Sequence, residues 1–178
     1  MTALLLVGFS ATAAAASDFT LRGTVWERAS KAAACKPDPL LLFSLALKES
    51  RSSAGKGMVA PHPFALRNAP SGATYPARYE QAKELLHRYL REDSLTDIGI
   101  MQINYRWNGN RVQNIEHLLD PEQNIRVGAA ILCESIAQYP RDIMLAIGGY
   151  HTRNPSREQD ARAYARDVLY IWRSIQQL

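Results

Sequence analysis

Features that would assign a function at once are scarce in this sequence of 178 residues. It has two cysteines and four histidines, and none of them form the closely spaced pairs that bind zinc. The lysines and arginines do not form a dense block interleaved with aromatic residues, which argues against nucleic acid as a partner. There is no internal repeat and no linker between two hydrophobic cores. We therefore expect a single domain, and nothing in the sequence implies a metal ion or an organic cofactor.

An apolar segment without charged side chains opens the sequence. Residues 1–16 have an apolar core followed by small residues, which is typical of a secretory signal cleaved after Ala16. The positive residues that usually precede such a core are missing, and the segment is too short to span a bilayer. We predict a signal peptide over 1–16, a mature domain over 17–178, and a periplasmic or secreted protein that is not stably inserted in a membrane.

The charge and the cysteines agree with an exported protein. The formal net charge is +4 and the isoelectric point is about 9.2, which suits contact with an anionic polymer without identifying it. In an oxidising compartment, Cys35 and Cys133 are candidates for a disulfide. The alternative is a pair of buried thiols, and the spacing alone does not decide between them.

The periodicity of apolar residues predicts a mainly α-helical domain. A region rich in glycine, proline and serine, 55–77, reads as a long loop, and a minor β-hairpin is expected near 92–104. The last helix is expected to open at a capping box that begins with Ser156. The other helices are predicted over about 19–34, 39–50, 79–91, 120–139 and 142–148.

One acidic residue lies in an unexpected position. In the helix 39–50, Asp38 suits the N-cap and Pro39 suits the first turn. The apolar stripe through Leu42, Leu45 and Ala46 continues to Glu49, which places a carboxyl group on the core-facing side. Burial disfavours the charged form of a carboxyl group, so Glu49 is a candidate proton donor near neutral pH. The alternative is that the stripe simply ends there, with Glu49 at the end of the helix.

Three separated segments resemble the lytic transglycosylases of the lysozyme-like superfamily. The first is Glu49-Ser50 at the end of an apolar helix. The second, Gly99-Ile100-Met101-Gln102, is similar to that family's Gly-Leu-Met-Gln motif. The third comprises 124–132 and 146–150 and resembles the family's helix and Ala-Tyr-Asn segment. The resemblance covers about residues 30–155 and implies a single lysozyme-like domain of the SLT type with a deep substrate cleft.

This resemblance implies an activity and a set of partners. The family cleaves the bond between N-acetylmuramic acid and N-acetylglucosamine in peptidoglycan and leaves an anhydromuramoyl end. The sequence is most similar to the small transglycosylases that accompany conjugation and type III or type IV secretion machines. A role in opening the cell wall locally for such an apparatus is therefore implied, with peptidoglycan glycan strands as the substrate.

The resemblance also implies roles for individual residues. Glu49 would protonate the glycosidic oxygen and then accept a proton from the C6 hydroxyl of the muramoyl residue. The implied substrate-binding residues are Ser50, Met101, Gln102, Asn104 and Tyr150. Three of these residues could instead have a purely structural role. Met101 is equally suited to the core, and Gln102 and Tyr150 could instead satisfy buried backbone groups.

Two positions depart from the pattern. His151 stands where the family has asparagine, which leaves any role of that asparagine in doubt. The segment 96–104 also resembles the active-site strand of animal c-type lysozymes, in which an aspartate at the position of Asp97 is a second catalytic carboxylate. The alternative is that Asp97 is a turn residue that bonds its own backbone. Three functional hypotheses therefore stand: a transglycosylase that uses Glu49 alone, a muramidase that uses Glu49 and Asp97, and an inactive wall-binding assembly module.

Overall fold

The computed structural model describes residues 19–178, so the predicted signal peptide over 1–16 lies outside the described residues. The predicted mainly helical fold is confirmed, with short strands beside the helices. The helices are α1 (Val25–Ala32), α2 (Pro39–Ser50), α3 (Tyr79–Glu92), α4 (Tyr105–Asn108), α5 (Pro121–Gln138), α6 (Ile143–Gly148) and α7 (Glu158–Ile175). The strands are β1 (Arg51–Gly55), β2 (Met58–Pro61), β3 (Leu66–Asn68), β4 (Gly72–Thr74), β5 (Asp97–Ile98) and β6 (Ile103–Asn104).

Three helices begin at the aspartates that the sequence places before them. The Asp38 side chain accepts a hydrogen bond from the backbone N–H of Leu40, with Pro39 as the first residue of α2. Asp120 accepts from the N–H of Gln123 at the start of α5, and Asp142 caps α6 in the same way. These bonds satisfy N–H groups that have no partner within the helix, so local chemistry sets where each helix begins.

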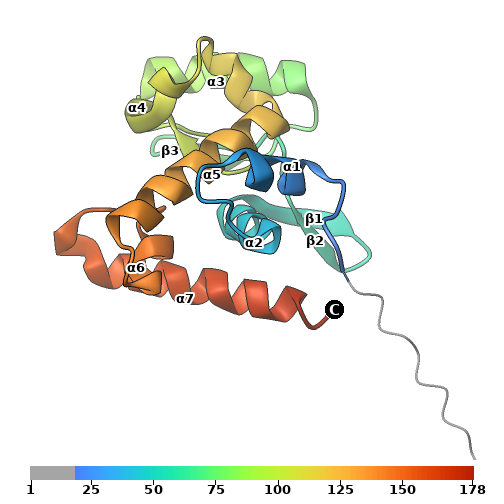
Figure 1. The fold of residues 1–178 in the computed structure, drawn as a ribbon. Coiled ribbons are helices and arrows are strands. Elements are labelled where there is room, and N and C mark those ends of the chain that lie inside the picture. Colours follow the sequence, from blue (N-terminus) through green and yellow to red (C-terminus); the bar gives the residue numbers. More distant parts are fainter. Residues whose placement is uncertain (1–18) are drawn as a thin grey trace, which may run out of the picture.

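The elements form two groups on either side of α5. Figure 1 shows α3, α4 and β3 above α5, and α6 and α7 below it. Helix α2 packs against α7, and α6 packs against both α5 and α7. A single hydrophobic core runs through both groups, with Leu42, Leu86, Ile125 and Leu132 fully buried.

The strands form two small antiparallel sheets. Strands β1 and β2 make a hairpin directly after α2, and the second sheet has the order β4-β3-β5-β6. In the second sheet Arg67 on β3 is paired with Asp97 on β5, and Asp97 is paired with Asn104 on β6. The expected hairpin near 92–104 is therefore present as β5–β6, and it places Asp97 between two other polar residues.

The structure corrects the boundaries of several elements. The segment 55–77 is not a continuous loop, because β2, β3 and β4 lie within it. Its glycines serve as hairpin turns: Gly55 and Gly57 flank the tip of β1–β2, and both have positive φ. Such turns carry the same residues as an open loop, which is why the sequence pattern did not reveal the strands.

The first and last helices also begin later than predicted. Helix α1 begins at Val25 because Gly23, with a φ of 75°, breaks the helical path just before it. The predicted capping box at Ser156 is not used. Instead the side chain of Asn154 accepts a hydrogen bond from the N–H of Ser156 and caps a 3₁₀ turn over Pro155–Arg157, after which α7 begins.

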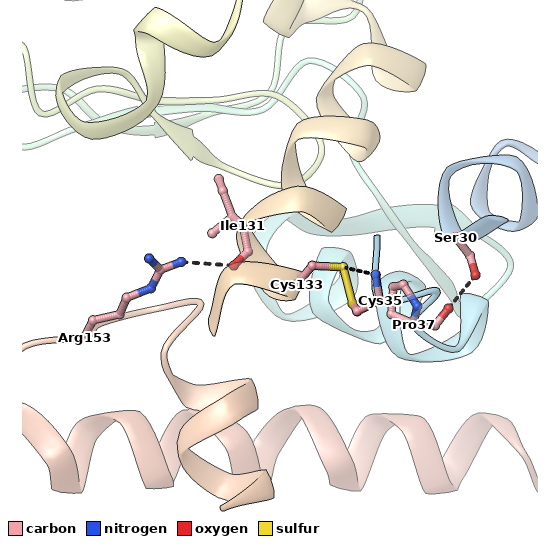
Figure 2. The surroundings of a disulfide bond; sticks show 6 residues. All are labelled: Ser30, Cys35, Pro37, Ile131, Cys133 and Arg153. Atoms are coloured by element: carbon pink, nitrogen blue, oxygen red, sulfur yellow. Dashed lines mark hydrogen bonds between the residues drawn. A yellow bond between two sulfur atoms is a disulfide. The ribbon is translucent and has the colours of Figure 1, made fainter. Parts of the chain in front are cut away.

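A disulfide joins Cys35 to Cys133 on α5, with their Cα atoms 5.4 Å apart. The open question of the cysteines is thus decided in favour of the bond. Figure 2 shows that the backbone N–H of Cys35 donates to the Cys133 sulfur and that the Ser30 hydroxyl donates to the carbonyl of Pro37. The connection between α1 and α2 is therefore fixed to α5. Among residues 19–178, no helix is long and apolar enough to cross a bilayer.

Candidate active site

A cavity of about 730 Å³ lies between the two groups of elements. Its lining comes from the end of α2, from the sheet β3-β5-β6, from the segment that follows α4, and from the connection between α6 and α7. Five of the seven site residues predicted from the sequence line it, namely Glu49, Asp97, Gln102, Asn104 and Tyr150. The fold therefore brings together residues that are up to about a hundred positions apart in the chain.

Glu49 lies in the last turn of α2, half-buried at the cavity wall. Its neighbour Lys48 is exposed and forms an ion pair with Asp167, with 2.6 Å between Nζ and Oδ2. Burial raises the pKa of Glu49 to about 7, and the nearby charge of Asp97 adds to the rise. A carboxyl group with this pKa can both donate and accept a proton near neutral pH.

The hydrogen-bond partner of Glu49 is Tyr164 on α7. The Tyr164 hydroxyl donates to Oε1 of Glu49 at 2.5 Å, and this bond partly opposes the rise in the Glu49 pKa. Burial and the charge of Glu49 raise the pKa of Tyr164 well above its ordinary value, so the hydroxyl keeps its proton. The ring of His151 stacks on that of Tyr164, with 5.0 Å between centroids and 8° between planes. The carboxyl group therefore has a hydroxyl donor whose ring is itself held in place.

Asp97 lies elsewhere on the lining of the same cavity. Its Oδ1 accepts a hydrogen bond of 2.8 Å from the side-chain amide of Asn104, its partner in the sheet register. Burial raises the pKa of Asp97, while the bond to Asn104 and the charge of Arg67 oppose the rise. Asp97 is thus fixed by a neighbouring strand rather than by its own turn.

A tight turn places Gln102 in the cavity lining. Gly99 and Gln102 both have positive φ, 76° and 48°. A Cβ atom at Gly99 would come within 2.3 Å of the Asn124 side chain and 2.5 Å of the Leu118 carbonyl, so only glycine fits there. The Gln102 amide donates to the carbonyls of Gly99 and Ala65. Both N–H donors are used in this way, which leaves the amide oxygen as the group suited to a substrate hydroxyl.

Two helices and the turn that follows α6 supply the side chains that hold this turn. From α2, the Ser50 hydroxyl donates to the carbonyl of Ile100 at 2.6 Å. From α5, the buried Asn124 donates to the carbonyl of Ile98 and accepts from the N–H of Met101. The Tyr150 hydroxyl donates to the carbonyl of Met101 at 2.8 Å. The turn is therefore tied directly to the helix that carries Glu49.

A sequence model described as the transglycosylase SLT domain matches residues 26–168, which is most of the chain. The chain belongs to this family. The predicted relationship to the lytic transglycosylases, with a mainly helical lysozyme-like domain, is thereby confirmed. Membership supports lytic transglycosylase activity on peptidoglycan in general. No curated protein and no solved structure gives a significant match.

Within this SLT domain, two predicted substrate-binding residues lie behind the cavity wall. Ser50 and Met101 are 1 % and 0 % exposed and are not part of the cavity lining. Met101 packs against Gly128 on α5, where a Cβ atom would come within 2.8 Å of its side chain. Ser50 bonds to the turn rather than facing the cavity. Both residues are placed to support Gln102 from within the core.

The SLT domain site also contains residues that the sequence analysis did not assign to it. Tyr164 on α7 is the residue that contacts Glu49. A buried tyrosine hydroxyl needs a hydrogen-bond partner, and this was the one signal available. Arg67 lies in the segment that was expected to be a loop.

Among residues 19–178, no group of three histidine, cysteine, aspartate or glutamate side chains is arranged to hold a metal ion.

Proposed function

We propose that this protein is an exported peptidoglycan lytic transglycosylase in which Glu49 is the only acid and base. The observation that carries the proposal is the environment of Glu49: a half-buried carboxyl group in the cavity lining, with a pKa near 7 and a tyrosine hydroxyl bonded to it. Such a group can be protonated when substrate binds and can hold a negative charge after it has given up its proton.

The reaction is cleavage of the bond between N-acetylmuramic acid and N-acetylglucosamine. Glu49 donates its proton to the glycosidic oxygen, the bond to the anomeric carbon breaks, and the N-acetylglucosamine leaves as the free alcohol. The Glu49 carboxylate then takes the proton of the muramoyl C6 hydroxyl, whose oxygen bonds to the anomeric carbon. Glu49 is thereby reprotonated and the product carries a 1,6-anhydro ring. No second carboxylate is needed, because the substrate supplies the nucleophile.

Groups in the cavity lining and behind it have supporting roles in this proposal. Tyr164 orients the carboxyl group and stabilises its charged form through the hydrogen bond. The Gln102 amide oxygen accepts a hydrogen bond from a sugar hydroxyl. Ser50 and Tyr150 act as positioning residues, because their hydroxyls hold the turn that presents Gln102.

A muramidase that uses both Glu49 and Asp97 is the second candidate. It is favoured by the fact that Asp97 lines the same cavity and lies close enough to raise the Glu49 pKa. In that mechanism Asp97 would stabilise or capture the cationic sugar and water would complete a hydrolysis. The hydrogen bond from Asn104 already occupies one oxygen of Asp97, and burial disfavours its charged form. Asp97 is therefore less suited to stabilise a cationic sugar.

Digestion of purified sacculi followed by mass spectrometry separates these candidates. A transglycosylase releases anhydromuramoyl ends, whereas a hydrolase releases reducing ends. Reducing ends alone would overturn the proposal in favour of the muramidase. Sacculi that are bound but not cut would instead support the third hypothesis, an inactive wall-binding assembly module.

Export and a role in a larger apparatus are part of the proposal. The Cys35–Cys133 disulfide supports an oxidising compartment, the periplasm or the exterior, since such bonds persist there. The resemblance to small transglycosylases of conjugation and type III or type IV secretion systems suggests that the enzyme opens the wall locally for such a machine. Deletion of the gene should then reduce transfer or secretion, and the Glu49→Gln variant should fail to restore it.

A further inference from the structure

Four arginines line the cavity, and one of them differs from the rest. Three are held by carboxylates of the protein, at distances of 2.6 to 3.4 Å. Arg67 forms no ion pair and no side-chain hydrogen bond with any residue in the range 19–178, so its five N–H donors are uncommitted there. The three ion pairs are Arg111–Glu134, Arg153–Glu134 and Arg157–Asp160.

The position of Arg67 is fixed by its strand. It is the central residue of β3, and its neighbours Leu66 and Asn68 are both buried. Because side chains alternate along a strand, Arg67 lies on the opposite face, where it is exposed and lines the cavity. Strand β3 is paired on both sides, with β4 and with β5. The guanidinium group thus extends from a supported backbone rather than from a free loop.

Arg67 also lies close to the groups proposed to carry out the reaction. It is paired with Asp97 in the sheet register, and its charge opposes the rise in the pKa of both Glu49 and Asp97. A cation at this place has no partner in the sugar rings of the substrate, which offer neutral hydroxyl and amide groups. The anionic groups of peptidoglycan are the free carboxylates of the peptides attached to its muramoyl residues.

We propose that Arg67 binds a carboxylate of the peptide carried by the muramoyl residue, which makes the enzyme selective for glycan strands with charged peptides. A guanidinium group matches a carboxylate with two parallel N–H···O bonds, which gives geometric selectivity as well as attraction. This inference rests on the proposed function, because it places the peptide-bearing sugar in the cavity next to Glu49.

The test compares two forms of one substrate. Native glycan strands are compared with strands whose peptide carboxylates have been converted to neutral amides by carbodiimide and ammonia. We expect kcat/KM to be about tenfold higher on the native strands, since one charge-assisted contact is of that order. The Arg67→Gln variant should lose most of this preference, and Arg67→Lys should keep part of it, because the charge remains while the two-pronged geometry is lost.

Arg166→Gln is the matched control. Arg166 is exposed on α7 and is two residues beyond Tyr164, so it lies on the far side of that helix from the cavity. This control should keep the full preference for native strands. A wild-type enzyme that cuts both substrates equally well would overturn the inference. An Arg67→Gln variant whose kcat/KM falls by the same factor on native and on amidated strands would also overturn the inference. Arg67 would then act through Glu49 or through the fold.

Binding separates this inference from the proposed function. Co-sedimentation of Glu49→Gln protein with native and amidated sacculi measures the preference without catalysis. If the wild type yields no anhydromuramoyl ends but binding still depends on Arg67 and on the carboxylates, the proposed function fails and the inference stands. If both kinds of sacculi are bound equally and anhydromuramoyl ends are formed, the inference fails and the proposed function stands.

Discussion

The two carboxylates of the cavity belong to regions built in different ways. Glu49 lies at the end of a helix that packs against α7, and its contact is a tyrosine hydroxyl. Asp97 lies in a two-residue strand, and its contact is the amide of an asparagine on the next strand. Burial raises the pKa of both. For Glu49 the pKa rises to about 7, so the helical region has a group ready to give and take a proton at neutral pH.

In the proposed mechanism the two regions have different tasks, catalysis in the helical region and support in the strand region. The helical region holds a carboxyl group against apolar surface with one hydroxyl bonded to it. The strand region holds Asp97 between polar neighbours in the sheet, with Arg67 on one side and Asn104 on the other. If the proposal is right, substitutions in the first region should affect the chemistry far more than those in the second.

The largest effect should come from Glu49→Gln. It keeps the shape of the side chain but removes the proton, so the release of anhydromuramoyl products should fall by about a thousandfold or more. Circular dichroism should show an unchanged fold. Glu84→Gln, the same change at an exposed site on α3, is the control and should leave activity intact. Activity in Glu49→Gln within tenfold of wild type would assign the chemistry to another residue.

The same variant should change the dependence of stability on pH. The pKa of Glu49 in the folded protein, about 7, is above its ordinary value of 4.5, so between these pH values the folded state keeps a proton that the unfolded state has lost. Wild-type stability therefore decreases over this window as pH rises. Glu49→Gln should gain up to about 3 kcal/mol relative to wild type between pH 4.5 and pH 8. Urea unfolding at the two pH values measures this gain, and a constant difference between the proteins would contradict it.

Tyr164→Phe should have an intermediate effect. Loss of the hydroxyl removes a hydrogen bond that lowers the Glu49 pKa, so that pKa should rise further and the alkaline limb of the pH–rate profile should move to higher pH. The maximal rate should fall by about tenfold, because the charged carboxylate loses a stabilising donor. Tyr170→Phe, on an exposed site of the same helix, should change neither quantity. A profile that does not move would remove Tyr164 from the proposed site.

Asp97→Asn should have the smallest effect. For a transglycosylase that uses Glu49 alone, the rate should fall by less than about tenfold, and the products should still carry anhydromuramoyl ends. Removal of the negative charge should also lower the Glu49 pKa slightly, which would shift the pH–rate profile in the direction opposite to that of Tyr164→Phe. A loss as large as that of Glu49→Gln would instead show a two-carboxylate enzyme.

Sequence reasoning predicted where α2 begins and which side of it carries Glu49, but it missed the contact that Glu49 makes. Asp38 and Pro39 mark the start of α2, and the apolar stripe leads to Glu49, because these signals lie within one helix. The partner of Glu49 is 115 residues further along the chain, and nothing near Tyr164 indicates this contact. Its position depends on how α7 packs against α2, which no local pattern specifies.

The strand region was harder to predict for a different reason. The strands of its sheet are two or three residues long, too short for an alternating pattern to emerge. Arg67 was therefore placed in a loop, and its pairing with Asp97 was not foreseen. Asn124 was recognised only as part of a family segment, because its three hydrogen bonds reach backbone groups that meet only after folding.

The disulfide makes a covalent ring of the chain between Cys35 and Cys133. Glu49, Arg67, Asp97 and Gln102 all lie inside this ring, whereas Tyr164 lies outside it. A protease that cuts once within the ring, for example after the exposed Lys56 at the hairpin tip, would open the circle without releasing a fragment. Such a nicked protein would remain one covalent molecule, with Glu49 still connected to Tyr164 through the disulfide.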